Sequence, residues 1–197
     1  MSSPNTIDSD TILDAAYDLL RNVGLQRVTM ADVARKAEVS RATLYRRFGS
    51  VREVIAALAT REWSAIVSET PFATMGHPVR PLLVDAIVEL VGRIRVHPLL
   101  RNIIDLDPNF LLPYLLHRKG ANANQQLELL HAALKIGHAD GSIRDDDVHM
   151  QANSVLLNAW SFTLTGPVLV NENDGTGPQL EALDGQLRLL LDRYLAP

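Results

Sequence analysis

Basic and hydroxyl side chains gather on one short segment of this 197-residue chain, and their chemistry suits contact with nucleic acid. Arginine can donate two hydrogen bonds to a guanine edge, whereas threonine and alanine suit a thymine methyl group. Threonine, tyrosine and arginine can also bind phosphate oxygens, which fix register without reading sequence. The segment contains Arg41, Ala42, Thr43, Tyr45, Arg46 and Arg47. It predicts a DNA-contacting surface, with an ordinary solvated basic face as the alternative.

Two short helices joined by a tight turn are predicted to position these side chains. The first starts at Thr29, because its hydroxyl can cap the next turn and Asp32 completes a capping-box spacing. After a turn at residues 38–39, Ser40 can cap the second helix, from Arg41 to Phe48. Its inward side chains are Leu44 and Phe48, four residues apart. A helical pair of this kind presents its second helix to the major groove of DNA.

A longer run carries a resemblance to a known family, and it reads ILDAAYDLLRNVGLQRVTMADVARKAEVSRATLYRRFGSVREVIAAL. This run closely resembles the DNA-binding domain of TetR-type (TetR/AcrR) transcriptional regulators. The matching positions are Gly24, Thr29, Met30, Val33, Ala34, Val39, Ser40, Thr43, Leu44, Tyr45 and Phe48. The resemblance covers about the first quarter of the chain, and we recognise no sequence motif beyond about residue 65.

The resemblance implies a role for each polar residue of the second helix. It implies base contacts from Arg41, Ala42 and Thr43, with Arg46 next, and phosphate contacts from Thr29, Tyr45 and Arg47. Ser40, at the start of the helix, belongs to the same candidate DNA-binding site.

The chain departs from the family pattern at three positions. Glu38 stands in the turn where many members have glycine, and a left-handed residue other than glycine costs about 1 kcal/mol there. Arg47 replaces a histidine common in the family. Val51 stands where many members have a lysine that touches a phosphate, and the neighbouring Arg52 is the candidate replacement.

Charge supports a localised DNA-binding surface independently of the resemblance. Between Arg21 and Arg52 there are eight basic and two acidic residues, a net charge of +6. The remaining 11 basic and 21 acidic residues give −10, so a basic block lies on an acidic protein of net charge −4.

Composition narrows the class of protein. With 47% hydrophobic residues the chain can bury one good core or two modest ones. It has no cysteine, which excludes disulfides and thiolate metal sites. The sequence shows no signal peptide, and no apolar run approaches the roughly 18 residues that span a bilayer. We therefore expect a cytoplasmic protein.

Helical periodicity extends over nearly the whole chain, and no segment alternates like a strand. The predicted fold is all-α, with a helix-turn-helix domain of three helices in residues 1–52 and a helical effector-binding and dimerisation domain in residues 53–197. About nine helices are expected, at about 9–23, 29–37, 41–48, 50–69, 81–96, 99–106, 109–137 with an interruption near Gly120, 145–165 and 179–195. Residues 166–178 are expected to form a loop.

The last two predicted helices carry wide apolar stripes. Each stripe could be ordinary core, but two such helices could also pair with a symmetry mate in a four-helix interface, an arrangement that the resemblance implies. A two-fold axis would then set two DNA-reading helices about one turn of DNA apart. The candidate interface residues are Val155, Leu156, Ala159, Leu183, Leu187 and Leu190.

A small-molecule effector is expected from the resemblance. The region between Trp63 and Trp160 is rich in apolar residues, so an apolar ligand is the natural prediction. Candidate pocket residues are Trp63, Phe72, Phe110, Tyr114, Asn158 and Trp160, each of which could instead be simple packing.

Metal and catalytic sites are not expected. His131 and His138 lie two helical turns apart, too far to share an ion without another chain segment. The chain has no nucleophile elbow, phosphate-cradling glycine loop or H-E-x-x-H pair, so no catalytic residue and no cofactor are predicted. A ligand-responsive dimeric regulator is the main hypothesis. An all-helical binding protein or enzyme with a non-functional DNA-binding head is the alternative.

Overall fold

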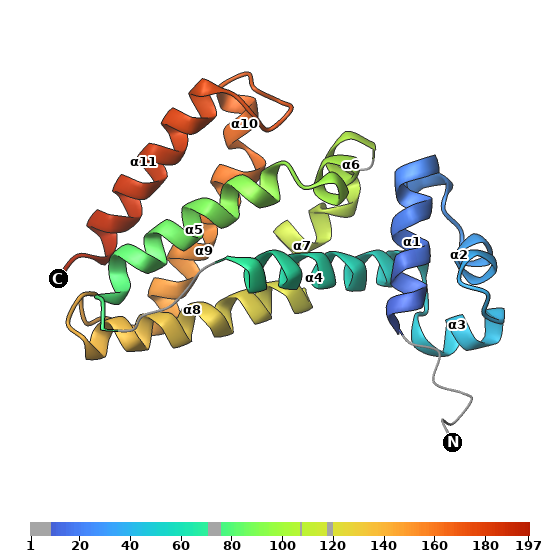
Figure 1. Cartoon of the computed structure of the whole chain (residues 1–197), viewed down its shortest axis with the longest axis horizontal. Helices are drawn as coiled ribbons and strands as arrows, with labels where there is room; N and C mark the ends of the chain where they lie inside the picture. Colours follow the sequence, from blue (N-terminus) through green and yellow to red (C-terminus); the bar gives the residue numbers. More distant parts are fainter. Residues whose placement is uncertain (1–8, 71–75, 107, 118–119) are drawn as a thin grey trace. The chain divides into compact units, whose positions relative to one another are not determined.

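The structure is a computed structural model that describes residues 9–70, 76–106, 108–117 and 120–197. Within these ranges it contains eleven α-helices, two 3-10 helices and no strand, so the all-α prediction is confirmed (Figure 1). The sequence predicted about nine helices, and the structure adds Leu112–Leu116 and Gly166–Leu169 as separate short helices. The α-helices are α1 (Ser9–Val23), α2 (Met30–Lys36), α3 (Arg41–Arg47), α4 (Val51–Glu69), α5 (Val79–Arg95), α6 (Pro98–Leu106), α7 (Leu112–Leu116), α8 (Ala121–Ala139), α9 (Val148–Leu164), α10 (Gly166–Leu169) and α11 (Pro178–Leu195).

The chain packs as two compact units that do not follow the order of the sequence. Unit 1 is formed by residues 1–62 and 98–120, and unit 2 by residues 63–97 and 121–197. The predicted boundary at residue 52 separates a DNA-binding domain from an effector-binding and dimerisation domain, and it stays a prediction. No helix in the described part of the chain is both long and apolar enough to cross a membrane.

Unit 1 is built around α1, whose amphipathic pattern buries Ile12, Ala16 and Leu20. Gly24 follows this helix with a φ of 76° and a ψ of 158°, a conformation that glycine adopts readily. In Figure 1, α2 and α3 lie next to each other beside α1. The core also includes Leu99 and Ile103 of α6, a distant segment that returns to pack against α1.

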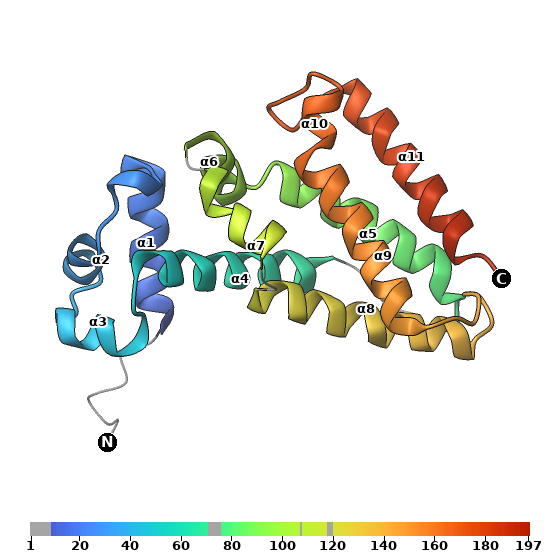
Figure 2. The same ribbon diagram turned by 180° about the vertical axis from the view of Figure 1, so that it is seen from behind.

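Unit 2 is a layered bundle in which α5 packs against α8, α9 and α11 (Figure 2). Its core includes Val84 and Val91 of α5 together with Leu187 and Leu191 of α11. The helix α9 begins after Asp147, whose carboxylate accepts hydrogen bonds from the His149 and Met150 amides. The sequence predicts the start of this helix at about residue 145, and the structure places it at Val148.

Candidate nucleic-acid interface

Thr29 and Asp32 form the predicted capping box at the start of α2. The Thr29 hydroxyl accepts a hydrogen bond from the Asp32 amide at 3.2 Å, and the Asp32 carboxylate accepts one from the Thr29 amide at 3.3 Å. The same hydroxyl donates to the carboxylate at 2.6 Å, which is the main cause that lowers the pKa of Asp32. The Thr29 side chain therefore fixes the start of α2, and its phosphate contact stays a prediction.

Glu38 makes the turn between α2 and α3 in a left-handed conformation, with a φ of 56°. The Val39 amide donates to the Ala34 carbonyl at 2.9 Å, and the Glu38 amide donates to the Arg35 carbonyl at 3.3 Å. These two bonds form a Schellman motif, whose left-handed position is usually glycine. The turn therefore holds a side chain in a conformation that L-residues rarely adopt.

Replacing Glu38 with glycine should raise the free energy of unfolding by about 0.5–1 kcal/mol. Glycine relieves the left-handed strain, and the gain is partly offset by its greater freedom in the unfolded chain. Urea unfolding measures this change. Glu38→Ala is the matched control, because it removes the carboxylate but keeps the β-carbon. An equal gain in both variants would assign the effect to charge and contradict the strain argument.

The helix α3 separates into a buried side and an exposed side. Ser40 caps it by accepting a hydrogen bond from the Thr43 amide at 3.0 Å, as predicted. Leu44 is fully buried. The helix ends at Arg47, one residue earlier than predicted, and Phe48 follows it and packs against the same core. Tyr45 is 54% exposed. The remaining outward residues are Arg41, Ala42, Arg46 and Arg47, all exposed, and Thr43, which is half-buried.

Two arginines of the candidate site have partners inside unit 1. Arg47 donates a hydrogen bond of 2.5 Å to the Ser9 hydroxyl at the start of α1. Arg52 donates to the Phe110 carbonyl at 3.3 Å, and its guanidinium lies 5.0 Å from the centre of the Phe110 ring. Within the described residues, no ion pair or hydrogen bond engages the guanidinium groups of Arg41 and Arg46. These two arginines are therefore available to a ligand.

Sequence reasoning missed the supporting elements that come from the later segment of unit 1, residues 98–120. The 3-10 helix Pro108–Phe110 supplies the ring and the carbonyl that hold Arg52, and Asn102 of α6 donates to the Leu20 carbonyl at 3.3 Å. The only signal in the sequence was the four-residue spacing of Leu99 and Ile103, which is typical of one face of a helix. It shows that α6 has a buried face but not which core it joins.

The helix pair and its neighbours also match known proteins. Residues 12–58 match the family model described as bacterial regulatory proteins, tetR family. The chain is also similar to an uncharacterized HTH-type transcriptional regulator of Mycobacterium bovis, with 30% identity over 195 residues, which cover 99% of this chain and 98% of that protein. The chain belongs to the TetR family of transcriptional regulators. The resemblance seen in the sequence is thus confirmed.

Solved structures of TetR-type regulators share the fold of this TetR-family chain. The TetR family repressor AlkX from Dietzia sp., implicated in biodegradation of n-alkanes, has a TM-score of 0.66 and 21% identity, covering 94% of each chain. FadR from Thermus thermophilus, solved in complex with lauroyl-CoA, has a TM-score of 0.65 and 20% identity, covering 96% of each chain. At these identities the likeness concerns the fold.

The six candidate pocket residues of this TetR-family regulator are divided between the units. Phe110 and Tyr114 lie in unit 1, with ring centroids 5.7 Å apart. Trp63, Asn158 and Trp160 lie in unit 2, and Phe72 lies outside the described residues. Trp63 is buried, and the Trp160 indole donates to Gln126 at 3.0 Å. Asn158 is exposed and donates to the Ser154 carbonyl, so its amide has a partner without any ligand.

The candidate dimer residues also separate into two groups. Val155, Leu156 and Leu187 are buried within the single chain, so their side chains belong to the core of unit 2 and offer no surface to a second copy. This corrects the sequence-based list, because a wide stripe does not reveal which side faces inward. Ala159 and Leu183 are partly buried, and Leu190 is 52% exposed.

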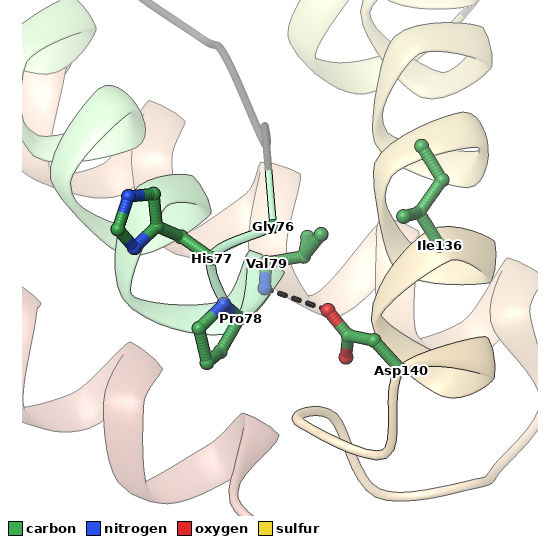
Figure 3. Close-up of a pocket in the computed structure, with 6 residues that line it drawn as sticks. All are labelled: Gly76, His77, Pro78, Val79, Ile136 and Asp140. Atoms are coloured by element: carbon green, nitrogen blue, oxygen red, sulfur yellow. Dashed lines mark hydrogen bonds between the residues drawn. The ribbon is translucent and has the colours of Figure 1, made fainter.

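An open cavity of about 360 Å³ lies in unit 2 at the start of α5 (Figure 3). It contains none of the candidate pocket residues. The Asp140 carboxylate at its edge accepts hydrogen bonds from the Val79 and Ser142 amides at 2.8 Å each. The lining residues are Gly76, His77, Pro78, Val79, Ile136 and Asp140. The carboxylate therefore caps the first turn of α5.

The Asp140 cap should make stability depend on pH in the acid range. Hydrogen bonds from the Ser142 hydroxyl and amide, then from the Val79 amide, lower the pKa of Asp140 below its ordinary value of 3.8. The carboxylate therefore stabilises the fold above pH 3.8, and this contribution is lost as the pH falls through the lower folded-state pKa. Asp140→Asn should be less stable than wild type by a constant amount above about pH 5 and by a shrinking amount below about pH 3.8.

Urea unfolding between pH 3 and pH 7 measures the difference between Asp140→Asn and wild type. Asp145→Asn is the control, since the Asp145 side chain is 98% exposed and should show no comparable deficit. A deficit of Asp140→Asn that persists unchanged at pH 3 would mean that its charge is not the stabilising feature.

Proposed function

We propose that this TetR-family regulator is a repressor that binds a palindromic operator as a homodimer and is released by a small, largely apolar effector. The observation that carries the proposal is the two-sided character of α3, with Leu44 buried and Arg41 and Arg46 exposed without partners among the described residues. A helix anchored on one side and lined with donors on the other can enter the major groove. The basic block between residues 21 and 52 supports the same surface.

The proposed contacts follow from exposure and chemistry. Arg41, Ala42, Thr43 and Arg46 are assigned to base edges. Thr29, Ser40, Tyr45 and Arg47 are assigned to the phosphate backbone or to holding α3 in position. Arg52 is less well supported as the replacement for the missing lysine, because its guanidinium is already held over Phe110.

The dimer face is proposed on the exposed sides of α9, α10 and α11. Leu157 is 64% exposed and Leu169 is 78% exposed, which is unusual for large apolar side chains that stay in water. Leu190 is the exposed leucine retained from the sequence-based list. On α11, Gly185 is exposed, and a β-carbon built there meets no atom within 4 Å. A glycine in open space costs helix stability and permits close approach of a second helix.

A double substitution tests the dimer and its link to DNA binding. Leu157→Asp with Leu190→Asp should convert the protein to a monomer in analytical ultracentrifugation and weaken binding to a palindromic duplex. Leu129→Asp on α8 is the control, because Leu129 is also about half exposed but lies on another helix. A double variant that remains dimeric would contradict the proposed face. A dimer without salt-sensitive, sequence-selective binding to any duplex would contradict the proposed function.

An effector releases the dimer from DNA only if it binds more tightly to a second conformer. In that conformer the spacing of the two α3 helices no longer matches the two half-sites of the operator. The helix α4 is the proposed lever, because its residues up to 62 belong to unit 1 and those from 63 belong to unit 2. The apolar composition between Trp63 and Trp160 supports an apolar effector. FadR from Thermus thermophilus was solved with lauroyl-CoA, and AlkX is implicated in biodegradation of n-alkanes, so acyl-CoA thioesters and alkanes are the first compounds to screen.

Thermal-shift measurements identify an effector because a ligand that binds only the folded state raises the melting temperature. A true effector should also release the labelled operator in a gel-shift assay. A compound that stabilises the protein without changing operator affinity would be a ligand but not an effector.

A further inference from the structure

Two histidines from neighbouring helices meet on the surface of unit 2. His131 lies on α8, and His149 lies in the first turn of α9, which packs against α8 (Figure 2). The His131 Nε2 and His149 Nδ1 atoms are 3.1 Å apart, and the ring centroids are 4.4 Å apart with an interplanar angle of 80°. The sequence places His131 and His138 too far apart to share an ion without another chain segment. The helix α9 supplies that segment.

The separation of the two nitrogens suits two ligands of one metal ion. Zinc binds imidazole nitrogen at about 2.0–2.1 Å, so two nitrogens at angles of about 90–110° on one ion lie roughly 2.9–3.4 Å apart. The observed 3.1 Å falls within this range. His149 is exposed and His131 is half-buried, so an ion can reach the pair from solvent.

We propose that His131 and His149 form a two-histidine site for a divalent transition-metal ion such as Zn²⁺ or Ni²⁺. Neutral imidazole suits these ions. In the hydrogen-bonded pair, one of the facing nitrogens carries the shared hydrogen. When both lone pairs bind the ion, that hydrogen is exchanged through solvent to the other nitrogen of the same ring, so two neutral rings release no net proton.

The surroundings define the character of the site. Within the described residues no group of three or more His, Cys, Asp or Glu side chains could hold a metal, so water would complete the coordination sphere. The positive end of the α9 dipole disfavours a cation, but the Asp147 carboxylate lies on that end and accepts from the His149 amide at 2.8 Å. The ion would tie α8 to the first turn of α9.

Titration of the untagged full-length protein with Zn²⁺ tests the site. We expect saturable binding of one ion per chain at pH 7.5, a rise in melting temperature, and loss of both at pH 5, where protons compete for imidazole. His149→Ala should lose the binding and the shift in melting temperature. His149→Gln should lose them too, while its amide can still hydrogen-bond to His131 and preserve the fold.

His77→Ala is the matched control, because His77 is exposed on a different element of unit 2 and its removal should leave zinc binding unchanged. Absence of saturable binding to the wild type would overturn the proposal. The proposal would also be overturned if both His149 variants bound zinc as tightly as the wild type, because the ion would then be held elsewhere. These measurements use no DNA, so their outcome is independent of the proposed repressor function.

Discussion

Replacing Arg41 with alanine should lower the affinity for the operator by about 5- to 150-fold, because a good bidentate contact to a base is worth about 1–3 kcal/mol. Arg41 is exposed at the start of α3, and within the described residues its guanidinium has no partner to lose. The fold should therefore be unaffected. Gel-shift titration with a duplex selected from a random library measures the loss, and circular dichroism checks the fold.

Two further variants separate base reading from general attraction. Arg101→Ala makes the same change of charge on α6, where Arg101 pairs with Asp105, and should change operator affinity less than about twofold. Arg47→Ala should weaken all duplexes alike and reduce the salt dependence by about one counterion, as expected for a phosphate contact. If Arg41→Ala also weakened all duplexes alike, its assignment to a base would be wrong.

Local signals in the sequence predicted the DNA-binding head well because its boundaries are set by local chemistry. Thr29 and Ser40 cap their helices through bonds to amides three residues away, and Gly24 ends α1. The inward direction of Leu44 follows from helical periodicity and its spacing from Phe48. Such features depend on neighbours within one turn, so a sequence states them directly.

Features that depend on distant partners could not be predicted in the same way. The apolar spacing of α6 showed a buried face, but only the fold assigns Leu99 and Ile103 to the core of unit 1. The stripes on α9 and α11 were wide enough to allow either an interface or a core. The structure buries Val155 and Leu187 and leaves Leu157 exposed, because α5 packs against both helices and α8 packs against α9.

The candidate site shows the same limit at the level of single side chains. The resemblance identified Arg47 and Arg52 by position, but it could not show that Ser9 and Phe110 hold them. It also could not bring His149 to His131, because 18 residues separate them in sequence. Residue chemistry was predictable in each case, and the partner was not.

Replacing Leu44 with alanine should lower the free energy of unfolding by about 2–5 kcal/mol, the cost of truncating a fully buried leucine. Leu44 is the buried residue of α3, a helix of seven residues, and helices this short are not stable in isolation. The loss should therefore disorder the DNA-reading surface and weaken operator binding as well. Leu44→Met keeps most of the volume and should cost less than about 1.5 kcal/mol.

The two-unit structure allows this effect to be assigned. Both tryptophans, Trp63 and Trp160, lie in unit 2, so tryptophan fluorescence follows that unit, whereas circular dichroism follows all helices. In Leu44→Ala, the transition followed by circular dichroism should begin at a lower urea concentration than the transition followed by fluorescence. Leu129→Ala, a truncation at a half-exposed position of α8, should shift neither by more than about 0.5 kcal/mol. Equal losses in the two alanine variants would show that α3 is not held through Leu44, because an exposed and a buried leucine would then contribute alike.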